Sequence, residues 1–154
     1  MAQSSSGFDM SKMSMGSKIL LGSGVLLLIF SFFAWQKVCV LDIACVNAGS
    51  MWGGSGAIFG ILGGLALIAL LVWEGLQVAG TDVSVGQPPS RISAYLGFAT
   101  AGLVVLKFVF ALTESPAFGA FIGLILALGV GYGAWMRFQE PAAMPAAPTN
   151  EGLA

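Results

Sequence analysis

The sequence contains no histidine and few charged residues. Six of its 154 residues are Lys or Arg and seven are Asp or Glu, so 8% are charged, whereas soluble domains carry about 25%. The missing histidine removes the commonest general base and the commonest transition-metal ligand. The net charge of -1 provides no basic face for nucleic acid. So few charges cannot cover a globule of this size, and the apolar surplus therefore has to face lipid.

The sequence also contains few thiols: Cys39 and Cys45 are its only cysteines. Two cysteines without histidine do not make a zinc site, and their spacing is not the Cys-x-x-Cys of a redox pair. No hydroxyl nucleophile has a base to activate it. We therefore expect no catalytic residue, no metal site, no cofactor and no enzymatic activity.

What the sequence does contain is a series of four apolar runs. It predicts helices over residues 18–37, 52–75, 92–113 and 116–137. Each run is near the roughly 20 residues that a spanning helix needs. We expect an all-α polytopic membrane protein, with an antiparallel bundle of four transmembrane helices over 18–137. Residues 1–17 are expected to form a polar cytoplasmic segment, and the Pro- and Ala-rich residues 138–154 a disordered cytoplasmic tail.

The basic residues predict the orientation of the bundle. With the N-terminus inside, Lys12, Lys18, Arg91 and Arg137 fall on the cytoplasmic side, and Lys37 alone falls in an outer loop. The positive-inside rule favours this arrangement. We expect an integral protein of the cell membrane, of the bacterial inner-membrane type, with both termini cytoplasmic.

Aromatic residues are expected to anchor the helices at the two membrane interfaces. Trp52 and Trp73 are 21 residues apart, which on one helix places them about 31 Å apart, close to the hydrocarbon thickness. Trp35 is predicted to end the first helix at the outer interface. Tyr95 and Trp135 are predicted at the inner interface.

Rows of small residues predict where helices pack closely. The second run carries Gly56, Gly60 and Gly64, and the fourth carries Gly119, Gly123, Ala127 and Gly131. Residues four apart share a helix face, and missing side chains let backbones approach. These rows are expected to pack either the chain's own bundle or an interface with a second copy or a partner protein.

Lys107 is the one charge in the interior of a predicted span, since Lys18, Lys37, Glu74 and Arg137 lie at the ends of theirs. A lysine at this depth costs a few kcal/mol and is by default a functional-site hypothesis. Its stem can instead extend outward toward Asp42, Glu114 or lipid headgroups. Glu74 follows Trp73, so its carboxylate is expected at headgroup level as an ordinary interfacial group, away from Lys107.

Cys39 and Cys45 lie in the predicted first outer loop. That loop faces the oxidising compartment, where a short disulfide can form. The preceding segment, Phe32-Phe33-Ala34-Trp35-Gln36, together with a basic residue late in the third helix, resembles small bacterial four-span membrane proteins of unassigned function. Ala34 departs from the proline of that pattern. The resemblance implies a four-span topology and brings no activity.

Two functions are compatible with these features. The first is a non-enzymatic accessory or scaffold subunit that packs in a larger membrane complex or in a homo-oligomer. The alternative is a small transporter or ion-conducting oligomer that uses Lys107. The expected partners are the lipid bilayer and a membrane protein, and not nucleic acid.

Overall fold

The computed structural model describes residues 13–81 and 86–140, and the described residues form four helices and three short strands. In chain order these are α1 (Met15–Phe30), β1 (Gln36–Val40), β2 (Ala44–Gly49), α2 (Ala57–Val78), α3 (Pro89–Leu112), β3 (Ser115–Pro116) and α4 (Phe118–Gln139). Lys12, most of the predicted N-terminal segment 1–17 and most of the predicted tail 138–154 lie outside the described residues.

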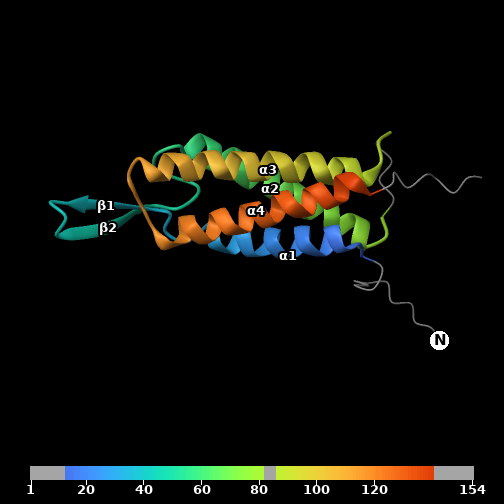
Figure 1. Cartoon of the computed structure of the whole chain (residues 1–154), viewed down its shortest axis with the longest axis horizontal. Helices are drawn as coiled ribbons and strands as arrows, with labels where there is room; N and C mark the ends of the chain where they lie inside the picture. The colour runs from blue at the N-terminus through green and yellow to red at the C-terminus, as the bar shows by residue number, and fades with distance from the viewer. Residues whose placement is uncertain (1–12, 82–85, 141–154) are drawn as a thin grey trace, which may run out of the picture.

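The helices lie side by side in an elongated bundle, and the β1–β2 hairpin projects from one end of it (Figure 1). The start of α1 and the end of α4 lie at the opposite end. α4 packs against both α1 and α3, and α3 also packs against α2. α2, α3 and α4 are long and apolar enough to cross a membrane, whereas α1 has 16 residues and is shorter. The fold is therefore mostly helical, with three candidate membrane spans among the described residues.

The helix predicted over residues 18–37 ends early, at Phe30. The Ser31 backbone N–H still donates to Leu27 O, and Ser31 Oγ donates to Leu28 O at 2.6 Å. The chain then becomes extended, and the Trp35 N–H donates to Gly49 O at 2.8 Å. Apolar composition does not distinguish a helix from buried extended backbone, because both can satisfy their backbone groups internally.

The small sheet corrects the all-α prediction. Its strand order is β2-β1-β3, and all neighbours are antiparallel. Cys39 pairs directly with Cys45, and β3 pairs only with the start of β1. Leu41 and Asp42 have positive φ at the tip of the hairpin, which is typical of tight hairpin turns. The strands are five, six and two residues long, too short for periodicity to separate them from a loop.

The prediction that Trp52 and Trp73 share one helix is also wrong, because α2 begins only at Ala57. The preceding residues 50–56 form a loop that folds back onto the bundle. In this loop Met51 is fully buried, and the Trp52 indole N–H donates to Ser31 Oγ at 3.0 Å. The loop therefore closes the hairpin end of the bundle.

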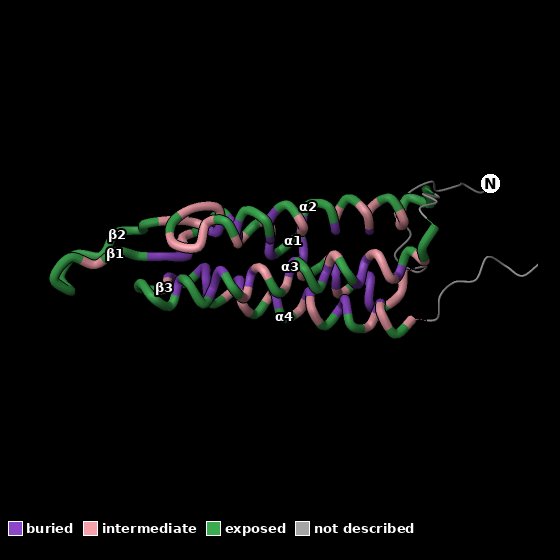
Figure 2. The backbone as a smooth tube through the Cα atoms, turned by 90° about the horizontal axis from the view of Figure 1, so that it is seen from above, coloured by how far each residue is buried: buried purple, intermediate pink, exposed green. Residues whose placement is uncertain are grey.

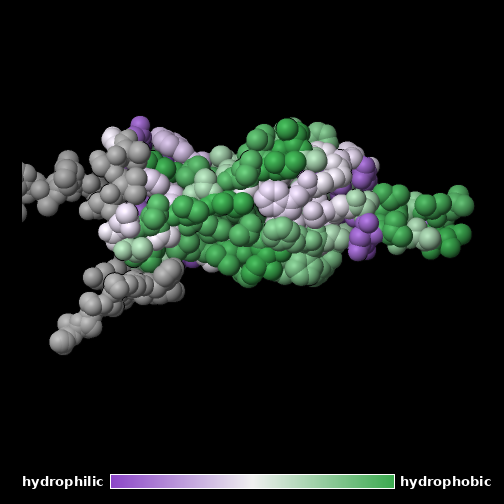
Figure 3. All heavy atoms as spheres, turned by 180° about the vertical axis from the view of Figure 1, so that it is seen from behind, coloured by the Kyte–Doolittle hydropathy of each residue, from purple (hydrophilic) through white to green (hydrophobic). Residues whose placement is uncertain are grey.

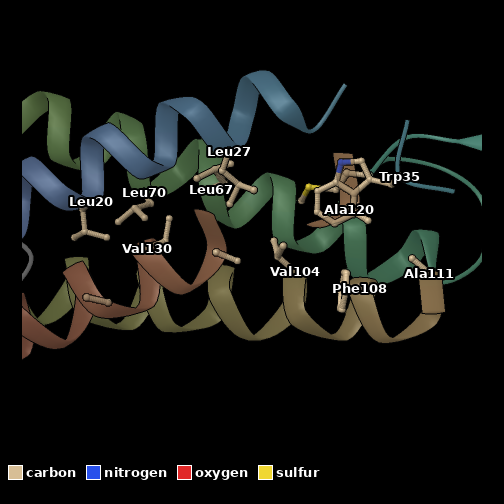
Figure 4. Packing of buried hydrophobic residues seen from close by; sticks show 13 residues of the cluster. Leu20, Leu27, Trp35, Leu67, Leu70, Val104, Phe108, Ala111, Ala120 and Val130 are labelled. Atoms are coloured by element: carbon tan, nitrogen blue, oxygen red, sulfur yellow. The ribbon is translucent and has the colours of Figure 1, made fainter. Parts of the chain in front are cut away.

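The core runs along the bundle axis and is almost wholly aliphatic in its middle (Figure 4). Buried positions face inward on all four helices, and exposed ones face outward (Figure 2). The fully buried side chains along the middle are Leu20, Leu27, Leu67, Leu70, Val104 and Val130. On the side that Figure 3 shows, apolar side chains cover much of the bundle surface. The exposed large hydrophobic residues come from all four helices. This distribution is what a protein surrounded by lipid requires.

The two predicted rows of small residues lie against other parts of the same chain. A Cβ at Gly60 would collide with Met51 O, and one at Gly64 would collide with the Trp52 ring. On α4, Gly119 faces Ala34 O and Gly123 faces the Trp35 ring. The remaining members also face inward: Gly56 against Phe110, Gly131 against Ala101, and Ala127 in the core. Most of these glycines therefore make room for loop residues and not for a neighbouring helix.

Candidate functional site: two polar clusters at the ends of the bundle

The first polar cluster lies at the end of the bundle away from the hairpin and centres on a buried ion pair. Arg137 Nε lies 3.2 Å from Glu74 Oε1, and the two side chains are 9% and 1% exposed. We call this group the inner cluster. An ion pair this deeply buried is stable only if its remaining donors and acceptors are also satisfied.

Side chains from every helix meet that requirement. Ser17 Oγ of α1 donates to Glu74 Oε2 at 2.9 Å. The remaining guanidinium nitrogens donate to the side-chain oxygens of Gln77 at 2.8 Å, Ser93 at 3.3 Å and Glu140 at 2.6 Å. The inner cluster therefore ties all four helices together at one depth.

The environment that the sequence predicted for Glu74 is therefore wrong. The carboxylate was expected at headgroup level as an ordinary interfacial group, and it is instead enclosed by the bundle. The pairing could have been found from topology, since α2 and α4 run in the same direction. Glu74 and Arg137 both lie within the last five residues of their helices, and hence at the same end of the bundle.

The second polar cluster lies below the hairpin and centres on Lys107, which is fully buried. Its Nζ donates to Gly53 O and to Ser55 O, each at 2.6 Å. The ammonium is therefore held by backbone carbonyl oxygens of the 50–56 loop and does not extend to solvent. Two carbonyl groups from one loop form a cradle for a cation, which this chain fills with its own lysine.

Gln36 and Glu114 complete the second polar cluster around Ser55, and we call this group the outer cluster. The Ser55 N–H donates to Gln36 Oε1 at 3.1 Å, and Gln36 Nε2 donates back to Ser55 O at 3.1 Å. Ser55 Oγ donates to Glu114. Glu114 was a predicted partner of Lys107, and it meets the lysine through Ser55, since the described residues contain no direct ion pair between them. Asp42 lies at the far tip of the hairpin.

Two glycines give the loop the shape that the cradle requires. Gly54 and Gly56 have φ values of +72° and +71°, a left-handed conformation that residues with a Cβ adopt at a cost. A Cβ at Gly54 would also collide with Gln36 Oε1. Gly56 thus serves as a turn residue before α2, in addition to its place in the predicted glycine row.

Between the two clusters the core is apolar. Among the described residues, Thr100 is the one buried polar side chain near mid-depth, and its hydroxyl donates to Leu96 O of its own helix at 2.8 Å. In the part of the chain that the structure describes, no group of three His, Cys, Asp or Glu side chains could hold a metal ion. The polar residues of each cluster contact one another, and Leu and Val side chains separate the two clusters.

The predicted aromatic anchors have different surroundings. Trp35 is fully buried, so it is a core residue and not an interface anchor. The Trp73 indole N–H donates to Pro89 O at 3.3 Å. Tyr95 and Trp135 are about half exposed, at 54% and 50%, on the outward faces of α3 and α4 near the inner cluster.

The structure joins Cys39 and Cys45 by a disulfide across the hairpin. The hairpin beyond this bond is apolar and exposed: Leu41 is 83% exposed and Ile43 is 86% exposed. Cys39 and Cys45 were expected as a possible disulfide in a loop, but neither the hairpin strands nor their apolar tip were predicted. Alternating residues such as Val38 and Val40 were a signal for a strand, although a weak one.

Comparison with protein-family models, with curated proteins and with solved structures gave no match for this chain.

Proposed function

We propose that this chain is a non-enzymatic integral membrane subunit that crosses the bilayer four times and packs in a larger membrane complex or homo-oligomer. The observation that carries the proposal is that the charged side chains of both polar clusters bind groups of this same chain and thereby stabilise the bundle. Arg137, Glu74 and Lys107 all have their partners within the chain. What the chain offers outward is apolar helix surface and an apolar hairpin.

The packing of α1 supports four spans, although α1 is the shortest helix. Gly133 of α4 approaches Leu20, Gly129 approaches Ser23, and Gly119 approaches Ala34. The segment from Leu20 to Ala34 thus runs beside α4 at the same depth. Together with the extended residues after Phe30, it covers most of the length of a helix that can itself span.

The charges support an inside location for both termini. The inner cluster, Lys18 and Arg91 lie at the end of the bundle where α1 begins and α4 ends. The hairpin end carries Lys37 and the buried Lys107, together with Asp42 and Glu114. Among the described residues, three basic side chains thus lie at the first end and two at the hairpin end. A basic excess at one end is what the positive-inside rule associates with the cytoplasm. The disulfide then lies on the oxidising side.

Transport through a single copy has less support. A proton or ion pathway needs polar groups at successive depths. The described middle of this core consists of leucine, valine and alanine, with one threonine whose hydroxyl donates within its own helix. Lys107 itself holds a loop in place. A conducting role therefore requires a pore formed between copies.

Isolation of the tagged chain from native membranes in mild detergent tests the proposal. We expect a membrane protein, or an untagged copy of this chain, to copurify in fixed proportion. An unrelated four-span protein with the same tag serves as the control. A clean monomer, together with crosslinking in native membranes that captures no protein, would contradict the proposed role.

A further inference from the structure

The seam between α3 and α4 carries a group of aromatic side chains at the end of the bundle where α1 begins. The Phe138 ring of α4 lies 6.4 Å from the Phe98 ring of α3 and 6.3 Å from the Trp135 ring, centroid to centroid. The Arg91 guanidinium lies over the same Phe138 ring, with its Cζ 4.7 Å from the centroid. Tyr95 follows Arg91 by four residues on the same face of α3 and is 54% exposed. We call these five residues the seam patch.

The seam patch is layered along the axis of the bundle. Arg91 is in the first turn of α3 and Phe138 is in the last turn of α4, so the guanidinium stands at the rim of the bundle. The backbones of Tyr95 and Phe98 lie about 6 and 10 Å deeper, at 1.5 Å per residue. The patch thus presents a cation at headgroup level and an aromatic wall toward the hydrocarbon. A phospholipid presents its phosphate and its acyl chains in the same order.

Arg91 has no carboxylate partner within the described residues. Both ion pairs found there belong to Arg137. Glu140, two residues beyond Phe138, binds Arg137 and lies against Gly16 of α1, outside the seam. A guanidinium stacked on an aromatic ring keeps its N–H groups available for an anion. The charge that complements the seam patch is therefore negative.

Two further donors near Arg91 lack an acceptor within the described residues. The other three indoles of the chain each donate to a chain oxygen, whereas the Trp135 indole N–H, on a half-exposed ring, has no such bond there. Ser90 is 7% exposed, and its Oγ is the one buried side-chain oxygen without a hydrogen-bond partner among these residues. Because Cα–Cβ bonds tilt toward the N-terminus of a helix, the Ser90 hydroxyl lies toward the rim where Arg91 stands.

The N-terminus of α3 adds positive potential at the same place. This helix has 24 residues, and its first turn has neither a side-chain cap nor an acidic residue. Such a helix end carries about half a positive elementary charge and suits a phosphate group. Ser90 and Arg91 both belong to this first turn. The helix end, the hydroxyl and the guanidinium therefore favour one and the same anion.

We infer that the seam patch binds an anionic phospholipid, with the lipid phosphate at Arg91 and an acyl chain along Tyr95, Phe98 and Trp135. An amphiphile contacts both layers of the patch, whereas free phosphate leaves the aromatic wall without a role. A zwitterionic lipid is less suited, because no described carboxylate faces the patch to bind its ammonium group. Basic sites between transmembrane helices on the cytoplasmic side are suited to anionic headgroups. The inference goes beyond the subunit role, since it holds whichever protein the chain packs with.

Native mass spectrometry of the full chain, released from detergent micelles, measures the bound lipid. The micelles contain equal amounts of phosphatidylglycerol and phosphatidylcholine with identical acyl chains. We expect the chain to retain phosphatidylglycerol in preference. Arg91→Gln should weaken this retention about tenfold, because charge-assisted hydrogen bonds to the phosphate are lost.

Lys18→Gln is the matched control. It makes the same charge change on an exposed residue of α1, at the same end of the bundle but outside the seam. Its effect on retention should stay within about twofold, because salt screens a distant surface charge. Arg91→Lys keeps the charge with fewer donors and should lose less retention than Arg91→Gln. Far-ultraviolet circular dichroism checks that each variant keeps its helices, and Arg91→Lys provides the comparison if Arg91→Gln does not.

Equal weakening by Arg91→Gln and Lys18→Gln, or equal retention of the two lipids by the unaltered chain, overturns the inference. Inorganic phosphate in excess should leave the lipid bound. Displacement of the lipid by inorganic phosphate would assign the site to the free anion and would also overturn it. A chain that copurifies with a membrane protein yet shows no lipid preference refutes the lipid site, while the proposed subunit role stands.

Discussion

Replacement of Arg137 by methionine tests how much the inner cluster contributes to stability. The substitution keeps a long apolar side chain and removes the guanidinium that donates to Glu74 and three other side chains. It leaves the Glu74 carboxylate, which is 1% exposed, without a counter-charge. Removing one partner of a buried ion pair costs about 3–5 kcal/mol, so the unfolding equilibrium constant should rise by more than about a hundredfold.

The double variant Glu74→Leu/Arg137→Met gives the sharper comparison. Replacing both members of a buried pair by apolar residues is often neutral or stabilising. The double variant should therefore be more stable than Arg137→Met, although Ser17, Gln77 and Ser93 lose partners in it. The two substitutions are expected to couple by about 0.5–3 kcal/mol, the range for residues in one network.

Reversible unfolding in mixed detergent micelles, followed by far-ultraviolet circular dichroism, measures these free energies. Arg91→Met is the control, because Arg91 lies over the Phe138 ring at 4.7 Å and such a contact contributes about 0.5–1 kcal/mol at exposed sites. The reasoning is refuted if Arg137→Met is no less stable than Arg91→Met. It is also refuted if the double variant loses the sum of the two single losses.

Three further predictions concern the outer cluster, the glycine rows and the hairpin. Lys107→Met should lower the free energy of unfolding by about 1–3 kcal/mol, because it leaves Gly53 O without a donor and removes one of the two donors to Ser55 O. Unchanged stability in the same assay would contradict the cradle. Gly123→Ala should lower the free energy of unfolding by about 1–3 kcal/mol, because the added Cβ collides with the Trp35 ring. Gly22→Ala has no atom within 4 Å of the added Cβ and should stabilise its helix by up to about 1 kcal/mol. Equal effects of the two substitutions on stability would contradict the packing of Gly123 against Trp35. Replacing Cys39 and Cys45 by serine should raise amide exchange in the hairpin and leave that of the helices unchanged; faster exchange throughout the bundle would show that the hairpin supports the whole fold.

Much of the helical arrangement could be predicted, because the length and composition of apolar runs respond directly to the bilayer. The predicted helix over 92–113 lies close to α3, which spans Pro89–Leu112. The predicted helix over 18–37 extends too far, because the uncharged apolar run continues past Phe30 to Trp35. In the structure the Trp35 backbone N–H donates to Gly49 O and not to a helical carbonyl. Hydropathy measures transfer into an apolar environment and does not record which backbone partner satisfies a given N–H.

The polar clusters were harder to predict, because each depends on groups far apart in the sequence. The two carbonyl oxygens that hold Lys107 lie more than 50 residues away from it, and no pattern in the sequence marks them. Glu74 and Arg137 are 63 residues apart, and antiparallel topology alone places them at one depth. The glycine rows were visible, but not the loop segments that occupy them, because a loop folding back onto its own helix has no periodic signature.

The four-span arrangement requires the hairpin and the α2–α3 turn to lie on opposite sides of the membrane. In intact cells, a membrane-impermeant maleimide should label Cys39 and Cys45 after reduction by an impermeant reductant. In a separate variant in which both native cysteines are serine, Thr81→Cys should react only after permeabilisation. Labelling of Thr81→Cys in intact cells, or protection of the reduced hairpin cysteines until permeabilisation, would contradict the four-span arrangement with both termini inside.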